Sequence, residues 1–236
     1  MSRLIGNSAL PGGGRLLQVG DCGPVDGIRP GHWFRLGLEG RRHALAVLDS
    51  SPREQWLAFQ LPAERAAGCA ALPYGTPCDL DGPFGEPVDF TAARRLIITA
   101  DEAGLPALLF ASRATDEPIH LALLAFEGEV PVRLCPSRFI VHGMPNSAIA
   151  GIAPLEEAGI ASRVAHPDPL PGCFQGTGPE LLAAYLAGKE ARWRWEVTIH
   201  VLARETALEA YRTRLRACAG RLRLTGLPAP AMPGRA

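Results

Sequence analysis

The stretch IITADEAGLPALL, residues 97–109, carries the clearest signal of fold class in the sequence. Its β-branched start predicts a buried strand, its polar middle a tight turn, and the apolar run Leu105–Ser112 a short helix. A strand, turn and helix in this order open a parallel α/β domain, in which the turn commonly holds a phosphate. Here the turn carries two carboxylates, Asp101 and Glu102.

The chain beyond this stretch continues to alternate between strand-like and helix-like segments. A threonine followed three residues later by glutamate, with proline between them, predicts a helix that begins after Thr177. Strands alternating with helices imply βαβ units, so we expect residues 91–227 to form a Rossmann-like parallel α/β domain. The expected strands are 119–126, 130–134, 160–165 and 195–202, and the expected helices lie within 147–158, 177–187 and 206–218.

The first 90 residues have a different character, with many glycines and prolines between short apolar runs. Short strands at spacings of about ten residues are typical of a small antiparallel β-barrel or sandwich. We expect residues 1–90 to form this unit, closed by a turn at Gly82–Gly85. The expected strands are 16–19, 33–38, 44–48 and 56–61.

Composition narrows the class of protein. The 236 residues include 24 basic and 24 acidic side chains, so the formal net charge is zero and gives no electrostatic case for nucleic acid. Arginines gather near the C-terminus, either as a solvated helix face or as a docking patch for an acidic partner. We find no signal peptide and no apolar run long enough to span a membrane, so we expect a cytoplasmic protein. Residues 228–236 are expected to be a disordered tail.

The cysteines give no sign of a metal centre. Zinc and iron–sulfur sites usually draw two ligands from one short turn, and no Cys-x-x-Cys pair is present. Buried, reduced thiols are therefore expected. The six are Cys22, Cys69, Cys78, Cys135, Cys173 and Cys218.

The order of the two domains resembles the ferredoxin reductase (FNR)-like superfamily, and within it the electron-transfer subunit of dihydroorotate dehydrogenase. Residues 30–36, PGHWFRL, are similar to a "P-G-Q-F-x-x-L" barrel strand of that superfamily. Residues 82–85, GPFG, are similar to its "G-P-x-G" turn, and 95–100, RLIITA, to the first strand of its nucleotide domain. The order and spacing of the three matches carry the resemblance.

In that superfamily the barrel holds a flavin through an "R-x-Y-S" motif, for which the best-placed match is residues 41–44, RRHA. The resemblance implies that FAD, if bound, would have its phosphate at Arg41 and its ring against His43. Backbone contacts would come from Gly82, Pro83 and Gly85. An alanine replaces the motif's serine, so a polar flavin atom would lose a partner, at a cost of about 1–3 kcal/mol. The alternative, which stays open, is a barrel strand that merely begins with two arginines.

The resemblance also implies a nucleotide turn reading "A-G-G-x-G-I-A-P", where residues 100–107 read ADEAGLPA. Gly104 is retained as a cofactor-binding position, but Asp101 and Glu102 replace the two leading glycines. Their bulk and charge oppose a pyrophosphate, so we expect NAD(P)H binding to be lost. The superfamily's late "C-G-P" is missing, as is the cysteine run that holds an iron–sulfur cluster, so no cluster is expected.

The functional expectation is a reductase-like electron-transfer or accessory subunit that acts with a protein partner. The alternative is a non-catalytic protein-binding or assembly scaffold built on the same fold. Fold alone does not choose between them, because activity depends on the site. No catalytic residue is assigned, and enzymatic activity stays an open question.

Overall fold

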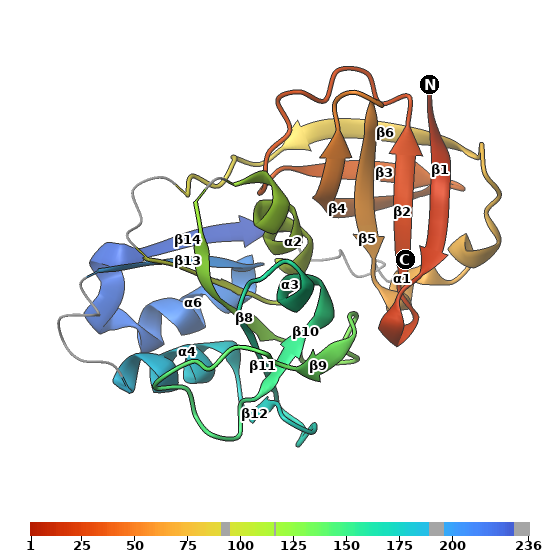
Figure 1. Ribbon diagram of the computed structural model, residues 1–236. Coiled ribbons are helices and arrows are strands. Elements are labelled where there is room, and N and C mark those ends of the chain that lie inside the picture. The colour runs from red at the N-terminus through yellow and green to blue at the C-terminus, as the bar shows by residue number, and fades with distance from the viewer. Residues whose placement is uncertain (91–94, 116, 189–195, 229–236) are drawn as a thin grey trace.

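A computed structural model describes residues 1–90, 95–115, 117–188 and 196–228. The chain forms a closed antiparallel barrel followed by a parallel α/β domain (Figure 1). Both expected domain types are therefore confirmed. The last barrel strand ends at Phe84 and the first strand of the second domain begins at Arg95.

The barrel has six strands in the order β1-β2-β5-β4-β3-β6, closed by the pairing of β1 with β6. Alternate side chains of each strand point inward and fill it with apolar residues such as Leu17, Leu36 and Phe59. The four expected strands are confirmed, whereas β1 and β6 are additional. The bounds are β1 Ser2–Ala9, β2 Arg15–Gly20, β3 Trp33–Leu38, β4 Arg41–Ser51, β5 Trp56–Leu61 and β6 Pro77–Phe84, with a short helix α1 at Ala63–Ala66.

The expected turn at Gly82–Gly85 is wrong in part, because Gly82, Pro83 and Phe84 belong to β6. The reason is a close approach between strands. A Cβ on Gly82, whose φ is +148°, would lie 2.6 Å from Cδ1 of Phe34, so only glycine fits beside that ring. Gly85 then turns the chain out of the barrel with a φ of +79°.

The second domain is a six-stranded, wholly parallel sheet in the order β12-β11-β8-β7-β13-β14. Helices α2 and α3 pack on one face, and α4 and α6 on the other. The direction of the connections reverses between β7 and β13, and ligands of open α/β sheets bind at the carboxyl ends of strands at such a point. The bounds are β7 Arg95–Ala100, α2 Leu105–Ala114, β8 Ile119–Ala125, α3 Ala153–Glu157, β11 Ser162–His166, β12 Phe174–Gln175, α4 Gly178–Ala187, β13 Val197–Arg204, α6 Glu205–Arg214 and β14 Leu222–Leu227.

Most expected elements of this domain are confirmed, including the capping box at Thr177 and Glu180. The strand expected at 130–134 is wrong: a short strand β9 (Leu134–Pro136) pairs instead with β10 (Ala150–Ile152). That pairing also limits the helix expected within 147–158 to α3. Residue 195 of one expected strand, and residues 229–236 of the expected tail, lie outside the described residues.

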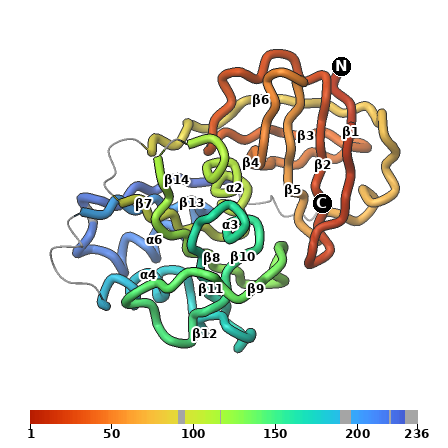
Figure 2. The backbone as a smooth tube through the Cα atoms, viewed as in Figure 1, coloured from red at the N-terminus to blue at the C-terminus, as the bar shows by residue number. Residues whose placement is uncertain are grey.

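Helix α2 joins the two domains, as the trace in Figure 2 makes clear, because it lies between the sheet and strand β4 of the barrel. Phe110 of α2 packs within the barrel core. Arg113 donates to the carbonyl oxygen of Leu48 at 2.7 Å and lies 3.2 Å from the carboxylate of Asp49. These contacts hold the carboxyl half of α2 against the barrel, while Pro106 at its amino end lines the cavity of the candidate site.

Of the helices that the structure describes, none has the length and apolar content needed to cross a bilayer.

Candidate functional site

The candidate site lies where β7 and β13 end, at the point where the strand connections reverse. Two side chains from distant parts of the chain meet there: Asp101, directly after β7, and Arg204, the last residue of β13. The pairing of the two parallel strands brings their carboxyl ends to the same edge of the sheet. This edge is where a parallel α/β fold offers a ligand site.

The carboxylate of Asp101 accepts four hydrogen bonds. Its Oδ1 accepts from the backbone N–H groups of Ala103 at 2.9 Å and Gly104 at 3.0 Å. Its Oδ2 accepts from the backbone N–H of Arg204 at 2.9 Å and from Nε of Arg204 at 3.0 Å. Asp101 is only 5% exposed. A side-chain anion therefore occupies the amino end of α2, where the turn of a nucleotide-binding domain would present N–H groups to a phosphate.

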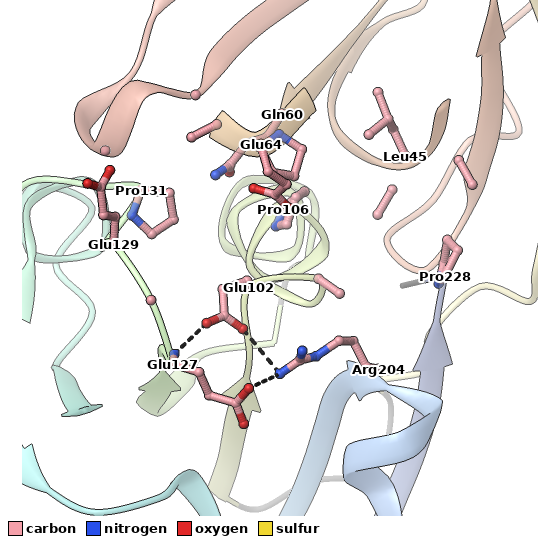
Figure 3. A pocket seen from close by; sticks show the side chains of 18 residues that line it. Leu45, Gln60, Glu64, Glu102, Pro106, Glu127, Glu129, Pro131, Arg204 and Pro228 are labelled. Carbon is pink, nitrogen blue, oxygen red and sulfur yellow. Dashed lines mark hydrogen bonds and ion pairs between the residues drawn. The ribbon is translucent and has the colours of Figure 1, made fainter. Parts of the chain in front are cut away.

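Arg204 continues the network toward solvent (Figure 3). Its guanidinium donates to Glu127 at 3.0 Å and lies 3.5 Å from the carboxylate of Glu102. Glu102 in turn accepts from the backbone N–H of Glu127 at 2.5 Å. Burial raises the pKa of the Glu102 carboxyl above its usual value, and the Glu127 N–H opposes that rise. One arginine thus faces three carboxylates, and the cluster is negatively charged.

Gly104 is held by packing. A Cβ at this position would lie 1.7 Å from the carbonyl oxygen of Leu202 in β13, so the helix can approach the sheet only if residue 104 is glycine. The prediction that Gly104 serves a cofactor stays a prediction. Its contact with β13 gives a sufficient structural reason for the residue.

A cavity of about 510 Å³ opens beside this network, between the barrel and the α/β domain. Its size is within the usual range for small-ligand sites. One side is largely apolar, formed by β4, the start of α1 and the amino end of α2, whereas carboxylates surround the rest (Figure 3). The residues that line the cavity include Ala44, Ala46, Gln60, Pro62, Glu64, Glu102, Pro106, Glu127, Glu129 and Arg204.

The structure does not bring the six sequence-predicted residues together in that cavity. Arg41 lies at the β3–β4 hairpin and lines a separate depression with Pro77 and Asp79. His43 is 5% exposed, because the pleat of β4 points it into the barrel with Leu45 and Val47.

The remaining predicted positions also lie outside the cavity. Gly82 and Pro83 are in β6, while Gly85 lines a second depression with His200 of β13. Gly104 is not among the residues that line the cavity, although Ala103 and Pro106 on either side of it are. A flavin-binding role for the six residues together stays a prediction.

The side chains at the cavity fit poorly with a dinucleotide. Among the described lining residues, Arg204 is the only cation, and Asp101, Glu102 and Glu127 already engage it. The N–H groups of Ala103 and Gly104, just before α2, face the place of a phosphate but donate to Asp101. The apolar side fits the planar ring of a flavin, but the phosphates of FAD or NAD(P)H would meet carboxylates.

Neither a metal centre nor a reactive thiol emerges from the geometry. Within residues 1–90, 95–115, 117–188 and 196–228, no three histidine, cysteine or acidic side chains are placed to hold a metal ion. All six cysteines are free. Burial raises the pKa of Cys22 and Cys78 to about 11, so both are protonated at neutral pH.

Sequence reasoning identified Asp101 and Glu102 but missed their partners. Arg204 appeared only as one of many late arginines, and Gln60, Glu64 and Glu127 had no signal. An arginine at the end of a buried strand is the single local feature that could have indicated Arg204. Its partner, Asp101, lies 103 positions earlier.

No family model matches the sequence, and a search of curated proteins found no match either. Solved structures do match, at low sequence identity. A ferredoxin reductase in carbazole 1,9a-dioxygenase superposes with a TM-score of 0.65 at 14% identity, covering 95% of this chain and 68% of that one.

Two further structures match over nearly the full length of both chains. A ferredoxin NADP+ reductase from Neisseria gonorrhoeae, with bound FAD and NADP, gives a TM-score of 0.62 at 10% identity and covers 95% of this chain and 97% of its own. A siderophore utilization protein from T. fusca gives 0.64 at 15% identity, with coverages of 98% and 94%. This chain therefore has the barrel-plus-α/β fold of the ferredoxin reductases.

Proposed function

We propose that this chain is an accessory subunit with a reductase fold, which works through a protein partner and does not bind NAD(P)H at the β7–α2 turn. The observation that carries the proposal is that the Asp101 carboxylate accepts four hydrogen bonds. The donors are the backbone N–H groups of Ala103, Gly104 and Arg204 and the Nε–H of Arg204. These donors are the ones that a pyrophosphate at this turn would need. The matched reductase in carbazole 1,9a-dioxygenase, named as part of a larger enzyme, supports the idea of a protein partner.

Electrostatics favours the same conclusion. A dinucleotide phosphate at the turn would lie against Asp101 and Glu102, and like charges brought together in a site cost several kcal/mol. Displacing Asp101 would also break its hydrogen bonds to Arg204. Contacts between the dinucleotide and the turn would have to offset both the charge repulsion and the lost hydrogen bonds.

Calorimetric titration of the purified protein with NADH and with NADPH tests the proposal. We expect no binding tighter than about 100 μM, which corresponds to roughly 5.5 kcal/mol. The double variant Asp101→Gly, Glu102→Gly should gain affinity if charge and bulk are the obstacle. The matched control is Glu209→Gln on the exposed face of α6. Tight binding by the unaltered protein would contradict the proposal.

A flavin-dependent electron-transfer subunit is the second candidate, favoured by the size of the interdomain cavity and its apolar side. In that case the flavin ring would lie against Ala44 and Ala46 of β4. The absorbance spectrum of the purified protein decides between the candidates. Flavin bands at near-stoichiometric occupancy would support electron transfer, whereas a colourless protein that also fails to take up added FAD would exclude it.

A further inference from the structure

Among the described residues that line the interdomain cavity, the polar residue with the least exposure is Gln60, on β5. Gln60 is only 7% exposed, and none of the hydrogen bonds between described residues involves its side-chain amide. Figure 3 shows the amide directed into the cavity from the barrel side. An amide in the cavity wall without a protein partner is available to hydrogen-bond a group that enters the cavity.

Carboxylates surround the same space. Glu64 lies on the barrel side, while Glu102, Glu127 and Glu129 come from the α/β domain. Arg204 offsets part of this charge, but its donors are directed to Asp101, Glu102 and Glu127. The cavity is therefore rich in acceptors, and a ligand that fits it must bring several donors and a positive charge.

Burial adds a second reason for a cation. The Glu102 side chain is 31% exposed, and its pKa is raised because burial penalises its charged form. One of its oxygens, Oε2, is buried and has no hydrogen bond within the described residues, only the 3.5 Å ion pair with Arg204. A cation in the cavity would stabilise the charged form of this carboxylate.

We infer that the interdomain cavity receives a guanidinium group, presented by an arginine side chain of a partner protein. The inference rests on the proposed function, since it gives the partner-binding subunit a specific contact. A guanidinium offers five N–H donors in a planar fork, which suits the Gln60 amide oxygen and the Glu102 carboxylate together. The apolar side, formed by Ala44, Ala46 and Pro106, suits the aliphatic stem of the same side chain.

The test is an NMR titration of the full chain with acetyl-arginine amide, read on the side-chain amide resonances. The Gln60 signal is identified by its loss in Gln60→Leu. We expect it to shift with saturation, with a dissociation constant of about 1 mM or tighter for this single-residue probe. Acetyl-citrulline amide, which has the same shape without the charge, should bind at least tenfold more weakly.

Variants locate the site. Glu102→Gln should weaken acetyl-arginine amide several-fold, and Gln60→Leu, followed on the remaining resonances, should do the same. Glu209→Gln on α6, outside the cavity, should leave the affinity unchanged. Affinity should also fall as salt concentration rises, because ion pairing contributes to it.

Three results would overturn the inference: no saturable shift up to ten times the expected constant, equal binding of the citrulline probe, or unchanged affinity in both cavity variants. Tenfold tighter binding of agmatine than of a Gly-Arg-Gly peptide would assign the cavity to a small molecule and refute the partner. The NAD(P)H titration separates these failures from failure of the proposed function, because it measures dinucleotide binding and does not depend on whether the cavity binds a guanidinium group.

Discussion

Replacing Asp101 by alanine tests whether this residue serves as the internal anion of the β7–α2 turn. The substitution removes the acceptor of four hydrogen bonds. The N–H groups of Ala103 and Gly104 then lose their partner in a largely buried turn, at about 1–3 kcal/mol for each buried donor left unpaired. Arg204 loses less, because it keeps Glu127 and can be hydrated at its exposed end.

The expected loss in the free energy of unfolding is therefore about 2–6 kcal/mol, a large part of the 5–15 kcal/mol of an ordinary domain. Urea unfolding measures it, followed by circular dichroism and by tryptophan fluorescence. Coincidence of the two curves would show that both domains unfold together and that one free energy applies.

A double-mutant cycle separates the ion pair from the rest of this loss. Asp101→Ala and Arg204→Met, alone and combined, should give a coupling energy of about 1.5–3 kcal/mol. The exposed pair Arg212 and Glu209, at 3.4 Å on α6, is the control and should give less than about 0.5 kcal/mol. Additive effects at Asp101 and Arg204, within about 0.5 kcal/mol, would refute the idea that one fixes the other.

Two further predictions concern the sheet behind the site. Gly104→Ala should cost about 3 kcal/mol or more in thermal or urea unfolding, because its Cβ would collide with the Leu202 backbone. Gly27→Ala, which meets no atom within 4 Å, is the control; equal melting of the two variants would contradict the packing argument. Burial lowers the pKa of His200 to about 4, so below pH 6.5 the unfolded state gains a proton that the folded state lacks. The protein should lose about 2 kcal/mol of stability between pH 7 and pH 5, and His200→Leu should lack that loss; the same pH dependence in both would disprove the cause.

The parts of the fold that the sequence predicted are those with local causes. The strand, turn and helix of residues 97–109 follow from periodicity and turn chemistry, and the helix after Thr177 follows from a capping box that the structure contains. Strand β6 could not be found in this way. Its Asp81-Gly82-Pro83 sequence is typical of a loop, and it becomes a strand because β1 and β3 on either side supply its hydrogen bonds.

In the candidate site too, some features follow from local sequence and others depend on the pairing of distant strands. The acids of the turn were evident from the sequence, but their role depended on Arg204, which only the pairing of β7 with β13 brings within reach. The direction of His43 depended on the register of β4 in the closed barrel. A one-residue change of register would turn every side chain of that strand to its other face, and nothing local fixes the choice.

Under the proposed function, the two acids of the turn oppose a phosphate for different reasons. Glu102 lies toward the cavity and acts through charge and desolvation. Asp101 occupies the position that a phosphate would take, because its carboxylate already accepts hydrogen bonds from the N–H groups of Ala103 and Gly104 and from two donors of Arg204. Glycine at 101 would free all of these donors, and an arginine beside vacant N–H groups is itself a phosphate-binding arrangement. Removing Glu102 alone would leave these donors hydrogen-bonded to Asp101. Under the proposed function, the absence of dinucleotide binding and the stability of the turn have one cause, which is the substitution of an internal carboxylate for an external phosphate.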